Sequence, residues 1–539
     1  MREALRGRGA QALIVGAAAL LVFVGLRTRQ YTDVDGALRC LEVFRHPGVF
    51  FGGNNHLLYP LDVLAWTRLA GFLGANVRDA ESFIRVTQGL NALAAAATIA
   101  LVYWLVAGAT ASRGAALAAA AAVAFSRAFL LHATNAAEPM VGLFLSLLAL
   151  ASAELGVRRG RAWPIAAAGI ALALSMATYE SMVLVAPAAV ALCLVSDGEA
   201  RPRPKTHPGP RRVGVMVVSA AISGLAIYGL AYAASGTGGP GEMVRRFVTV
   251  PGAGIWGGLR LSKLANAPLG GVNAVVPALP RGYAGLRTLL RSPEQRVALA
   301  WISLLIVGAG AAVVAMLVRA RRAWSAFPAD RRRMGASLAV GLIFALVVPL
   351  YWDPVYDKLW LQPLALAACL GAVALAPVGV APPRSGRRTA VTALVVGLAA
   401  VNLGWAVPAS RKRSPYLEPA RQVAATVRAG DLVVHDWDPV SVLYTSMWPE
   451  SARQVDFISA AIELGQTELT GLRDAVAAAQ RRGGTVYFLG VLDEPRAAWN
   501  AFVGHFSHIP YEALDGYRDS ARIVASFPAP VGQVTLRRY

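Results

Sequence analysis

Charged residues are scarce in this sequence, since Asp, Glu, Lys and Arg make up only 15% of its 539 residues. Apolar residues account for 56%, and the mean hydropathy is +0.49. Soluble domains of ordinary composition carry about 25% charged residues. Disordered chains hold few apolar residues and much charge. The composition therefore excludes both classes and predicts a polytopic membrane protein.

Cysteine is nearly absent, and the three that occur are Cys40, Cys193 and Cys369. They are scattered and have no spacing typical of metal ligands, so neither a disulfide framework nor a zinc site is indicated. The sequence also lacks a basic patch interleaved with aromatic residues. The formal net charge of +21 therefore does not indicate nucleic-acid binding.

Eleven apolar runs have a length near the roughly 20 residues that a helix needs to cross a bilayer. The first is followed by no small-x-small cleavage site, so we expect a retained helix rather than a signal peptide. The predicted spans are 10–26, 88–107, 114–131, 139–156, 163–178, 180–196, 213–234, 297–318, 335–351, 359–377 and 389–408.

Arginine placement predicts the orientation of these spans. The connections at 158–161, 201–212, 319–333 and 384–388 are basic, as cytoplasmic loops are. If 163–178 and 180–196 are two separate spans, all four basic connections lie on the same side of the membrane as the N-terminus. We therefore expect a protein of the cytoplasmic (inner) membrane, with a cytoplasmic N-terminus and an exterior C-terminus.

The predicted fold class is an all-α membrane bundle of about eleven helices with a small C-terminal α/β domain outside the cell. The membrane domain covers residues 1–410, with long exterior loops at 27–87 and 234–296. Residues 57–69 within the first loop predict an amphipathic helix at the membrane surface. Residues 411–539 have an ordinary globular composition, with buried strands predicted near 431–435 and 485–489.

An acidic pair, Asp33 and Asp35, opens the first exterior loop. In extended backbone, residues two apart project to the same side. Two such carboxylates could bind a divalent cation, or one of them could act as a general base. The alternative is a solvated acidic loop without a ligand.

Further polar residues gather at the exterior ends of the predicted spans. Ionisable residues at membrane depth mark functional sites by default, although single residues at span ends also serve as anchors that reach into the headgroup region. These candidate substrate-binding residues are His56, Tyr59, Arg85, His132, Glu138, Tyr179, Glu180, Asp353 and Lys358.

In their order along the chain, these motifs resemble the GT-C superfamily of integral-membrane glycosyltransferases, the group of the protein O-mannosyltransferases and bacterial aminoarabinose transferases. The family pattern is an acidic pair in the first exterior loop, then a helix containing His, Tyr and Pro, then an Arg at the second span. Glu138 followed by proline at the fourth span is also similar. Residues 177–180 depart from the family, because they read Ala-Thr-Tyr-Glu where related sequences often have Leu-Thr-Lys-Gly.

The resemblance implies transfer of a sugar from a polyprenyl-phosphate donor to a hydroxyl acceptor, with inversion, at the outer face of the membrane. It makes Asp33 or Asp35 the catalytic base, with Asp33 favoured because it lies nearer the span. Lys358, Arg85 and Arg260 become candidates for stabilising the leaving phosphate. Some members use a divalent metal and others do not, so Asp33 and Asp35 are also the candidate metal ligands.

Two other functions fit the same sequence. One is a transporter or flippase of lipid-linked sugars, although the inverted repeats and broken helices common in transporters are not evident. The other is a non-catalytic membrane scaffold whose exterior domain binds partners, which gives the clustered polar residues no purpose.

Overall fold

The structure is a computed structural model, and it describes residues 2–29, 34–45, 56–195, 208–235, 259–278, 293–377, 385–435, 439–448, 452–456, 469–496, 499, 509–529 and 532–539. The chain divides into two compact units. Residues 1–28 and 46–410 form the helical unit, and residues 29–45 and 411–539 form the second, mixed unit. Each is described by itself.

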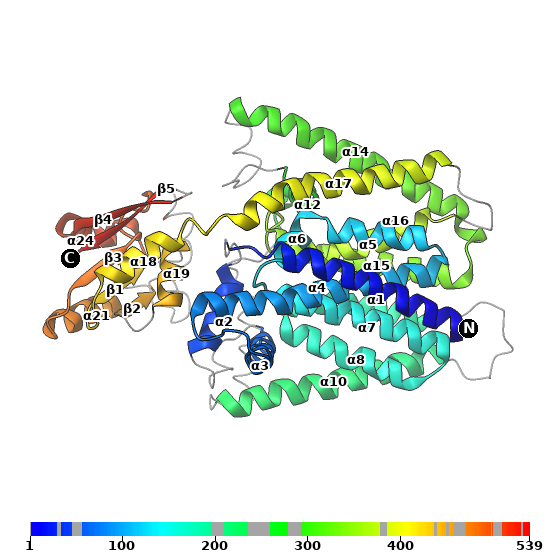
Figure 1. Cartoon of the computed structure of the whole chain (residues 1–539), viewed down its shortest axis with the longest axis horizontal. Coiled ribbons are helices and arrows are strands. Elements are labelled where there is room, and N and C mark those ends of the chain that lie inside the picture. Colours follow the sequence, from blue (N-terminus) through cyan, green and yellow to red (C-terminus); the bar gives the residue numbers. More distant parts are fainter. Residues whose placement is uncertain are drawn as a thin grey trace. The chain divides into compact units, whose positions relative to one another are not determined.

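The helical unit is a bundle of long apolar helices (Figure 1). Its elements are α1 (Arg2–Gly25), α3 (Tyr59–Phe72), α4 (Ala80–Thr110), α5 (Arg113–Ala124), α6 (Arg127–Ala133), α7 (Pro139–Arg159), α8 (Ala162–Thr178), η1 (Glu180–Val185), α9 (Ala186–Leu194), α10 (Pro208–Ser235), α12 (Leu261–Val275), α14 (Pro293–Ala323), η2 (Trp324–Ala326), α15 (Ala329–Tyr351), η3 (Asp357–Trp360), α16 (Leu361–Leu375) and α17 (Ser385–Arg411).

Every predicted span falls on an apolar helix or helix pair of the described residues. Eight helices are long and apolar enough to cross a membrane, the pair α5–α6 forms one bent candidate, and α8 and η1–α9 are shorter apolar helices. The predicted fold class, a multi-pass helical membrane protein with a small C-terminal sheet, is thereby confirmed. The helix predicted at 57–69 corresponds to α3, but its apolar side chains do not gather on one face, because Leu69 is exposed while Thr67 is buried.

Burial separates the helices into central and peripheral ones. The apolar windows of α4 and α7 are 67% and 72% buried, whereas those of α10 and α14 are each only 6% buried. Protein side chains surround α4 and α7, whose Ala-rich faces permit close helix packing. The exposed apolar faces of α10 and α14 suit contact with lipid tails.

The predicted span 114–131 is not one straight helix, because α5 and α6 meet at an angle of 68°. The sequence predicts one unbroken helix here, and this prediction is wrong at Phe125 and Ser126. Asn402 of α17 donates a hydrogen bond to the Phe125 carbonyl at 2.7 Å, which satisfies a backbone group at the break. In the hydrocarbon region such internal pairing is what makes a break tolerable.

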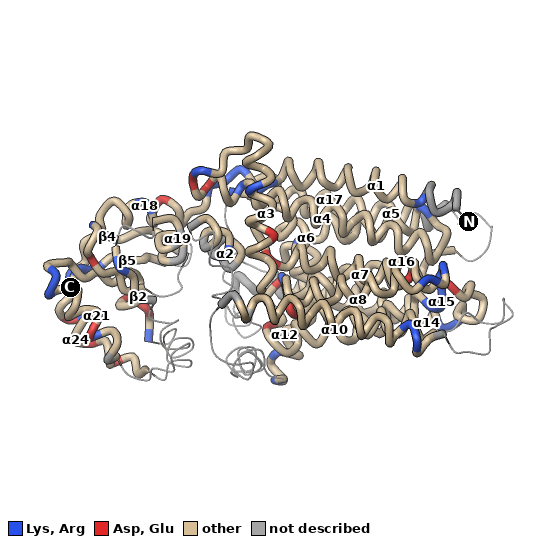
Figure 2. The backbone as a smooth tube through the Cα atoms, turned by 90° about the horizontal axis from the view of Figure 1, so that it is seen from below, with Lys and Arg blue, Asp and Glu red and all other residues tan. Residues whose placement is uncertain are grey.

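Charge is confined to the ends of the bundle, and one group of Lys and Arg lies at the end that holds the N-terminus (Figure 2). There α7 and α15 are joined by buried ion pairs. Arg333 contacts Asp330 at 3.0 Å and Glu154 at 3.5 Å, and Glu154 also pairs with Arg158. Buried charges need such partners, because desolvation of an unpaired one is costly.

The second unit is a small sheet with helices around it. Its elements are α2 (Val34–Arg45), α18 (Leu417–Thr426), β1 (Leu432–His435), α19 (Pro439–Met447), β2 (Arg453–Asp456), α21 (Thr470–Arg481), β3 (Val486–Leu489), η4 (Tyr511–Leu514), α24 (Asp515–Ser520), β4 (Arg522–Ala529) and β5 (Gly532–Arg538). The strand order is β2-β1-β3-β5-β4, with β2, β1 and β3 parallel and β5 antiparallel to both neighbours. Trp499, fully buried in the core, donates to the Ile509 carbonyl.

Arg331, at the start of α15, closes the C-terminal end of α16. Its buried guanidinium donates hydrogen bonds to four backbone carbonyls, those of Val373, Ala374, Ala376 and Pro377. The shortest of these bonds are 2.7 Å, to Val373 and Ala376. It also stacks on Phe327, 3.8 Å from the ring centroid. The last carbonyls of a helix have no partner within the helix, so this one side chain satisfies the end of α16 and fastens it to α15.

We therefore expect Arg331→Ala to lower the free energy of unfolding by about 3 kcal/mol, since several buried carbonyls lose their donor. The measurement is thermal unfolding of the purified protein in detergent. Arg332→Ala is the matched control, because this neighbouring arginine is half-buried and donates no such bonds to α16. Equal unfolding midpoints for the two variants would show that Arg331 does not hold α16.

Candidate active site

Four helix ends of the helical unit bring predicted site residues together around His56. His56 precedes α3, Glu138 precedes α7, Tyr179 and Glu180 lie between α8 and α9, and Lys358 lies in η3. Because α7 begins beside Glu138 and ends at the basic residues Arg158 and Arg159, this cluster lies at the opposite end of α7 from them.

The His56 imidazole lies between two carboxylates. Its Nδ1 is 3.0 Å from Glu180 Oε2, and its Nε2 is 3.5 Å from Glu138 Oε2. The backbone N–H of His56 also donates to Glu180 Oε1 at 2.7 Å. Glu138 is fully buried. We name these residues, together with Tyr179 and Lys358, the His56 cluster.

The backbone at His56 adopts a left-handed conformation, with φ of 60°. Few residues other than glycine adopt it, although histidine does so more readily than most, and strained backbone of this kind clusters at functional sites. Two hydrogen bonds hold this turn: Tyr59 N–H donates to the His56 carbonyl at 3.2 Å, and Leu58 N–H donates to the Ala177 carbonyl at 3.0 Å. The turn therefore presents the imidazole to the end of α8.

Tyr179 supplies one wall of the site. Its ring stacks on the imidazole, with centroids 4.7 Å apart and planes 6° from parallel. A Cβ added at Gly142 of α7 would lie 2.9 Å from the Cβ of Tyr179. Glycine at this position therefore permits the close approach of α7 that places the tyrosine over His56.

Lys358 provides a second cation at the cluster. It is buried, and its ammonium lies 4.7 Å from the ring centroid of Tyr356 and 5.9 Å from that of Tyr179. Cation–π contacts of this kind attract an ammonium to the face of an aromatic ring and so help to hold the lysine in place.

Asp357, next to Lys358, is held by two residues that are not adjacent to it in the sequence. Arg127 contacts its carboxylate at 2.9 Å and His132 at 3.3 Å. Arg127 also donates to the Asn273 carbonyl of α12 and lies over Trp405 of α17. His132 thus belongs to a group that fixes η3, and so the position of Lys358. Arg127 lies inside an apolar run, and an ionisable residue in such a place is the feature of the sequence that could have indicated this group.

The remaining predicted residues lie elsewhere or are not described. Tyr59 is buried in the first turn of α3. Arg85 and Asp353 are exposed, and their side chains make no contact with the His56 cluster in the described part of the chain. Asp33 lies outside the described residues. Asp35 belongs to α2 of the second unit, but its side chain is not described, so their metal-binding and base roles stay predictions.

Among the residues that the structure describes, no group of three or more His, Cys, Asp or Glu is arranged to hold a metal ion. The cluster instead combines two carboxylates, an imidazole and an ammonium. Such a set can bind an anion at the cations and hold a proton on the imidazole.

Electrostatics favours the charged form of His56. Burial lowers the pKa of the imidazole, but the carboxylates of Glu138 and Glu180 raise it and outweigh the burial, while Lys358 opposes them. The pKa of His56 is therefore above its ordinary value. The two ring nitrogens of this imidazolium each face one of the carboxylates.

Together, the fold and the cluster define a multi-pass membrane protein with a buried polar site at one end of its helices. The family described as "Dolichyl-phosphate-mannose-protein mannosyltransferase" matches residues 81–228, a segment that contains Glu138, Tyr179 and Glu180. Among curated proteins, none matches the sequence.

Two crystal structures of ArnT from Cupriavidus metallidurans match this chain along nearly its whole length. The one bound to undecaprenyl phosphate is 11% identical with a TM-score of 0.55, over 98% of this chain and 97% of that one. The apo structure is 13% identical with a TM-score of 0.46, over 98% of both chains. With the family match, the former confirms the resemblance to the GT-C membrane glycosyltransferases.

The raised pKa of His56 predicts a pH dependence of stability. A group whose pKa is higher in the folded state stabilises the fold fully below its unfolded value, near 6.5, and this stabilisation is lost as pH rises through the folded value. We expect His56→Asn, which suits the left-handed backbone, to remove this loss from the thermal unfolding midpoints measured between pH 6 and 9.

Glu180→Gln is the matched variant, because it keeps the imidazole but removes one carboxylate that raises its pKa. Its loss of stability should therefore begin at lower pH than in the unmodified protein. Identical pH profiles for all three proteins would contradict the ion pairing of His56.

Proposed function

We propose that this protein transfers a sugar from a polyprenyl-phosphate donor to a hydroxyl acceptor, and that the His56 cluster binds the donor phosphate. The observation that carries the proposal is that two cationic groups, partly buried His56 and buried Lys358, lie with the carboxylates of Glu138 and Glu180 at a helix end of an apolar bundle. The ends of membrane-spanning helices lie at the level of the lipid headgroups, which is where a lipid phosphate contacts a membrane protein.

The comparisons support the same class of substrate. The matched family is described by its dolichyl-phosphate-mannose donor, which is a lipid-phosphate sugar. The structurally similar ArnT binds undecaprenyl phosphate. The sugar and the acceptor differ among such enzymes, and the His56 cluster does not contain a feature specific for one of them.

The reaction is a single displacement. A carboxylate, Asp33 or Asp35, removes the proton of the acceptor hydroxyl, and the oxygen bonds to the anomeric carbon. The bond between that carbon and the phosphate oxygen breaks at the same time, with inversion. Polyprenyl phosphate leaves with the electron pair, and the base then releases its proton to water.

Negative charge grows on the phosphate oxygen as this bond breaks, and preorganised cations stabilise it most effectively where water is excluded. Lys358 supplies a buried positive charge beside two aromatic rings. His56 adds the positive charge of its imidazolium, whose two ring nitrogens face Glu138 and Glu180. Glu138 and Glu180 keep the imidazole protonated and oriented. Asp357 positions Lys358 through its contacts with Arg127 and His132.

The basic end of the bundle supports an orientation for this chemistry. Short loops rich in arginine stay in the cytoplasm, and Arg158, Arg159 and Arg161 lie at the end of α7 opposite Glu138. The His56 cluster then faces the outer side of the cytoplasmic membrane, where polyprenyl-linked sugars are displayed to acceptors.

The test compares cell-envelope glycans by mass spectrometry in cells that carry the unmodified protein or a variant. We expect Lys358→Met to reduce transfer by about 10²–10³-fold, the usual loss for one electrostatic group in the transition state. Lys263→Met is the control, because Lys263 donates to the Tyr351 carbonyl outside the cluster. Equal transfer by both variants would remove Lys358 from the mechanism.

Asn substitutions at Asp33 and Asp35 test the base separately. The variant that removes the base should lose about 10²–10⁴-fold in transfer. Full transfer by both variants would contradict the base assignment. The glycosyltransferase proposal would be overturned if cells with the unmodified protein contained no glycosidic bond that cells without it lack. That result would favour transport of a lipid-linked sugar.

A further inference from the structure

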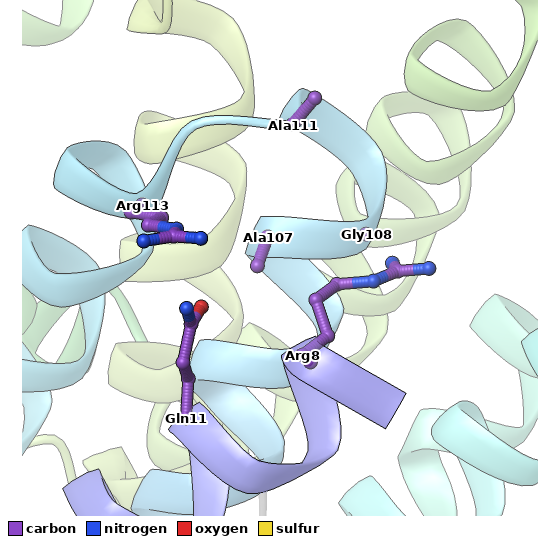
Figure 3. A pocket seen from close by; sticks show the side chains of 7 residues that line it. Arg8, Gln11, Ala107, Gly108, Ala111 and Arg113 are labelled. Carbon is purple, nitrogen blue, oxygen red and sulfur yellow. The ribbon is translucent and has the colours of Figure 1, made fainter. Parts of the chain in front are cut away.

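A second polar pocket lies at the other end of the bundle, between α1, α4 and α5. Its volume is ≈ 470 Å³, and Arg8, Gln11 and Arg113 line it together with glycine and alanine residues (Figure 3). These side chains lie near the start of α1, the end of α4 and the start of α5. The pocket is thus at the helix ends opposite the His56 cluster.

Hydrogen bonding orients the polar side chains of this pocket. Figure 3 shows the guanidinium of Arg113 and the amide of Gln11 facing each other. With the amide oxygen directed at the guanidinium, Gln11 Oε1 accepts from Arg113 Nη2 at 3.1 Å and its amide nitrogen donates to the Tyr103 hydroxyl at 2.9 Å. Gln11 is therefore fixed by a buried tyrosine and holds Arg113 toward the pocket.

Arg8 occupies the opposite wall. Its guanidinium lies over Trp104, 5.8 Å from the ring centroid, and next to Gly108, where an added Cβ would lie 2.5 Å from Arg8 Nη1. The Gly108 carbonyl accepts a hydrogen bond from Arg158 at 2.8 Å. Glycine at 108 therefore leaves the space that the Arg8 side chain fills.

Two arginines give the lining of the pocket positive charge. Within the described residues, Arg113 forms no ion pair with a carboxylate, and the polar atoms that face it belong to the neutral amide of Gln11. The carboxylates of Glu154 and Asp330 contact Arg158, beyond Gly108, and also attract the guanidinium of Arg8. Two guanidiniums at one concave site attract an anion, and arginine matches phosphate geometry well.

Exposed apolar residues adjoin the pocket on the side toward the membrane interior. Ile14 follows Gln11 by three residues and Leu117 follows Arg113 by four, so each lies one turn farther along the same face of its helix. Their exposed fractions are 68% and 49%. A ligand with a phosphate at the arginines would place its chains against these residues, which favours a phospholipid over a free phosphate.

We propose that this pocket binds the phosphate headgroup of an anionic membrane phospholipid. Basic pockets between transmembrane helices at the cytoplasmic side bind such headgroups. Arg8 and Arg113 contact the phosphate, Gln11 orients Arg113, and Ile14 and Leu117 contact the acyl chains. This site is separate from the His56 cluster, so it stands independently of the proposed function.

Native mass spectrometry of the purified full chain tests this site, with phosphatidylglycerol and phosphatidylcholine of matched acyl chains supplied in equal amounts. We expect preferential retention of phosphatidylglycerol. Arg113→Gln should reduce its binding about fivefold, which corresponds to about 1 kcal/mol for one arginine at an anionic headgroup. The double variant with Arg8→Gln should lose it almost completely.

Arg161→Gln is the matched control, because it removes one exposed arginine from the same end of the bundle without touching the pocket. It should retain phosphatidylglycerol like the unmodified protein. Thermal unfolding midpoints measured in phosphatidylcholine show whether the variant with Arg8→Gln folds. If it does not, the single variant Arg113→Gln decides the test, because Arg113 is exposed.

Three results would overturn the proposal. The two lipids could bind equally, or Arg113→Gln could lose no more lipid than Arg161→Gln. Inorganic phosphate that displaces phosphatidylglycerol at micromolar concentration would instead identify a site for soluble phosphate.

Discussion

Burial of charge in an apolar bundle is the constraint on which this structure depends. An ionised group inside the bundle needs a partner, because hydrocarbon offers it no hydrogen bond. His56 meets this requirement with Glu138 and Glu180, and Asp357 meets it with Arg127 and His132. These pairs join helix ends that are up to 230 residues apart in sequence. The same contacts that satisfy the charges thus assemble the site.

The positively charged side chains have different surroundings at the two ends of the bundle. At the basic end, Arg158 and Arg333 are neutralised by Glu154 and Asp330, and Arg331 closes a helix end. At the other end, Lys358 contacts the rings of Tyr179 and Tyr356, and His56 is paired with Glu138 and Glu180. Aromatic rings thus surround the ammonium at this end, whereas the guanidiniums at the basic end contact carboxylates and carbonyls.

Much of the fold could be predicted from the sequence, because hydropathy and arginine placement act locally. The boundary at Tyr179–Glu180 followed from charge alone, and the structure ends α8 at Thr178. The break between α5 and α6 could not be predicted, because Asn402, a residue far along the chain, stabilises it. Because residues 114–131 were predicted as one helix, Arg127 was not recognised as part of the site. Its partner Asp357 is also distant in sequence.

For the site, the sequence indicated which span ends carry polar residues, but not their partners. His56, Glu138, Glu180 and Lys358 come together, whereas the side chains of Arg85 and Asp353 point to no common ligand with them. Hydropathy does not distinguish an arginine at a span end that anchors a helix from one that contacts substrate. That distinction depends on the tertiary packing of α3, α7, α8 and η3.

The most direct measurement of the central claim is photo-crosslinking with a polyprenyl-phosphate probe that carries a diazirine beside the phosphate, followed by peptide mapping. The account predicts labelling of the segments that contain His56, Glu138, Tyr179 or Lys358. It also predicts loss of this labelling when unlabelled polyprenyl phosphate is added in excess. Labelling confined to the segments around Arg8 and Arg113, at the opposite end of the bundle, would contradict it.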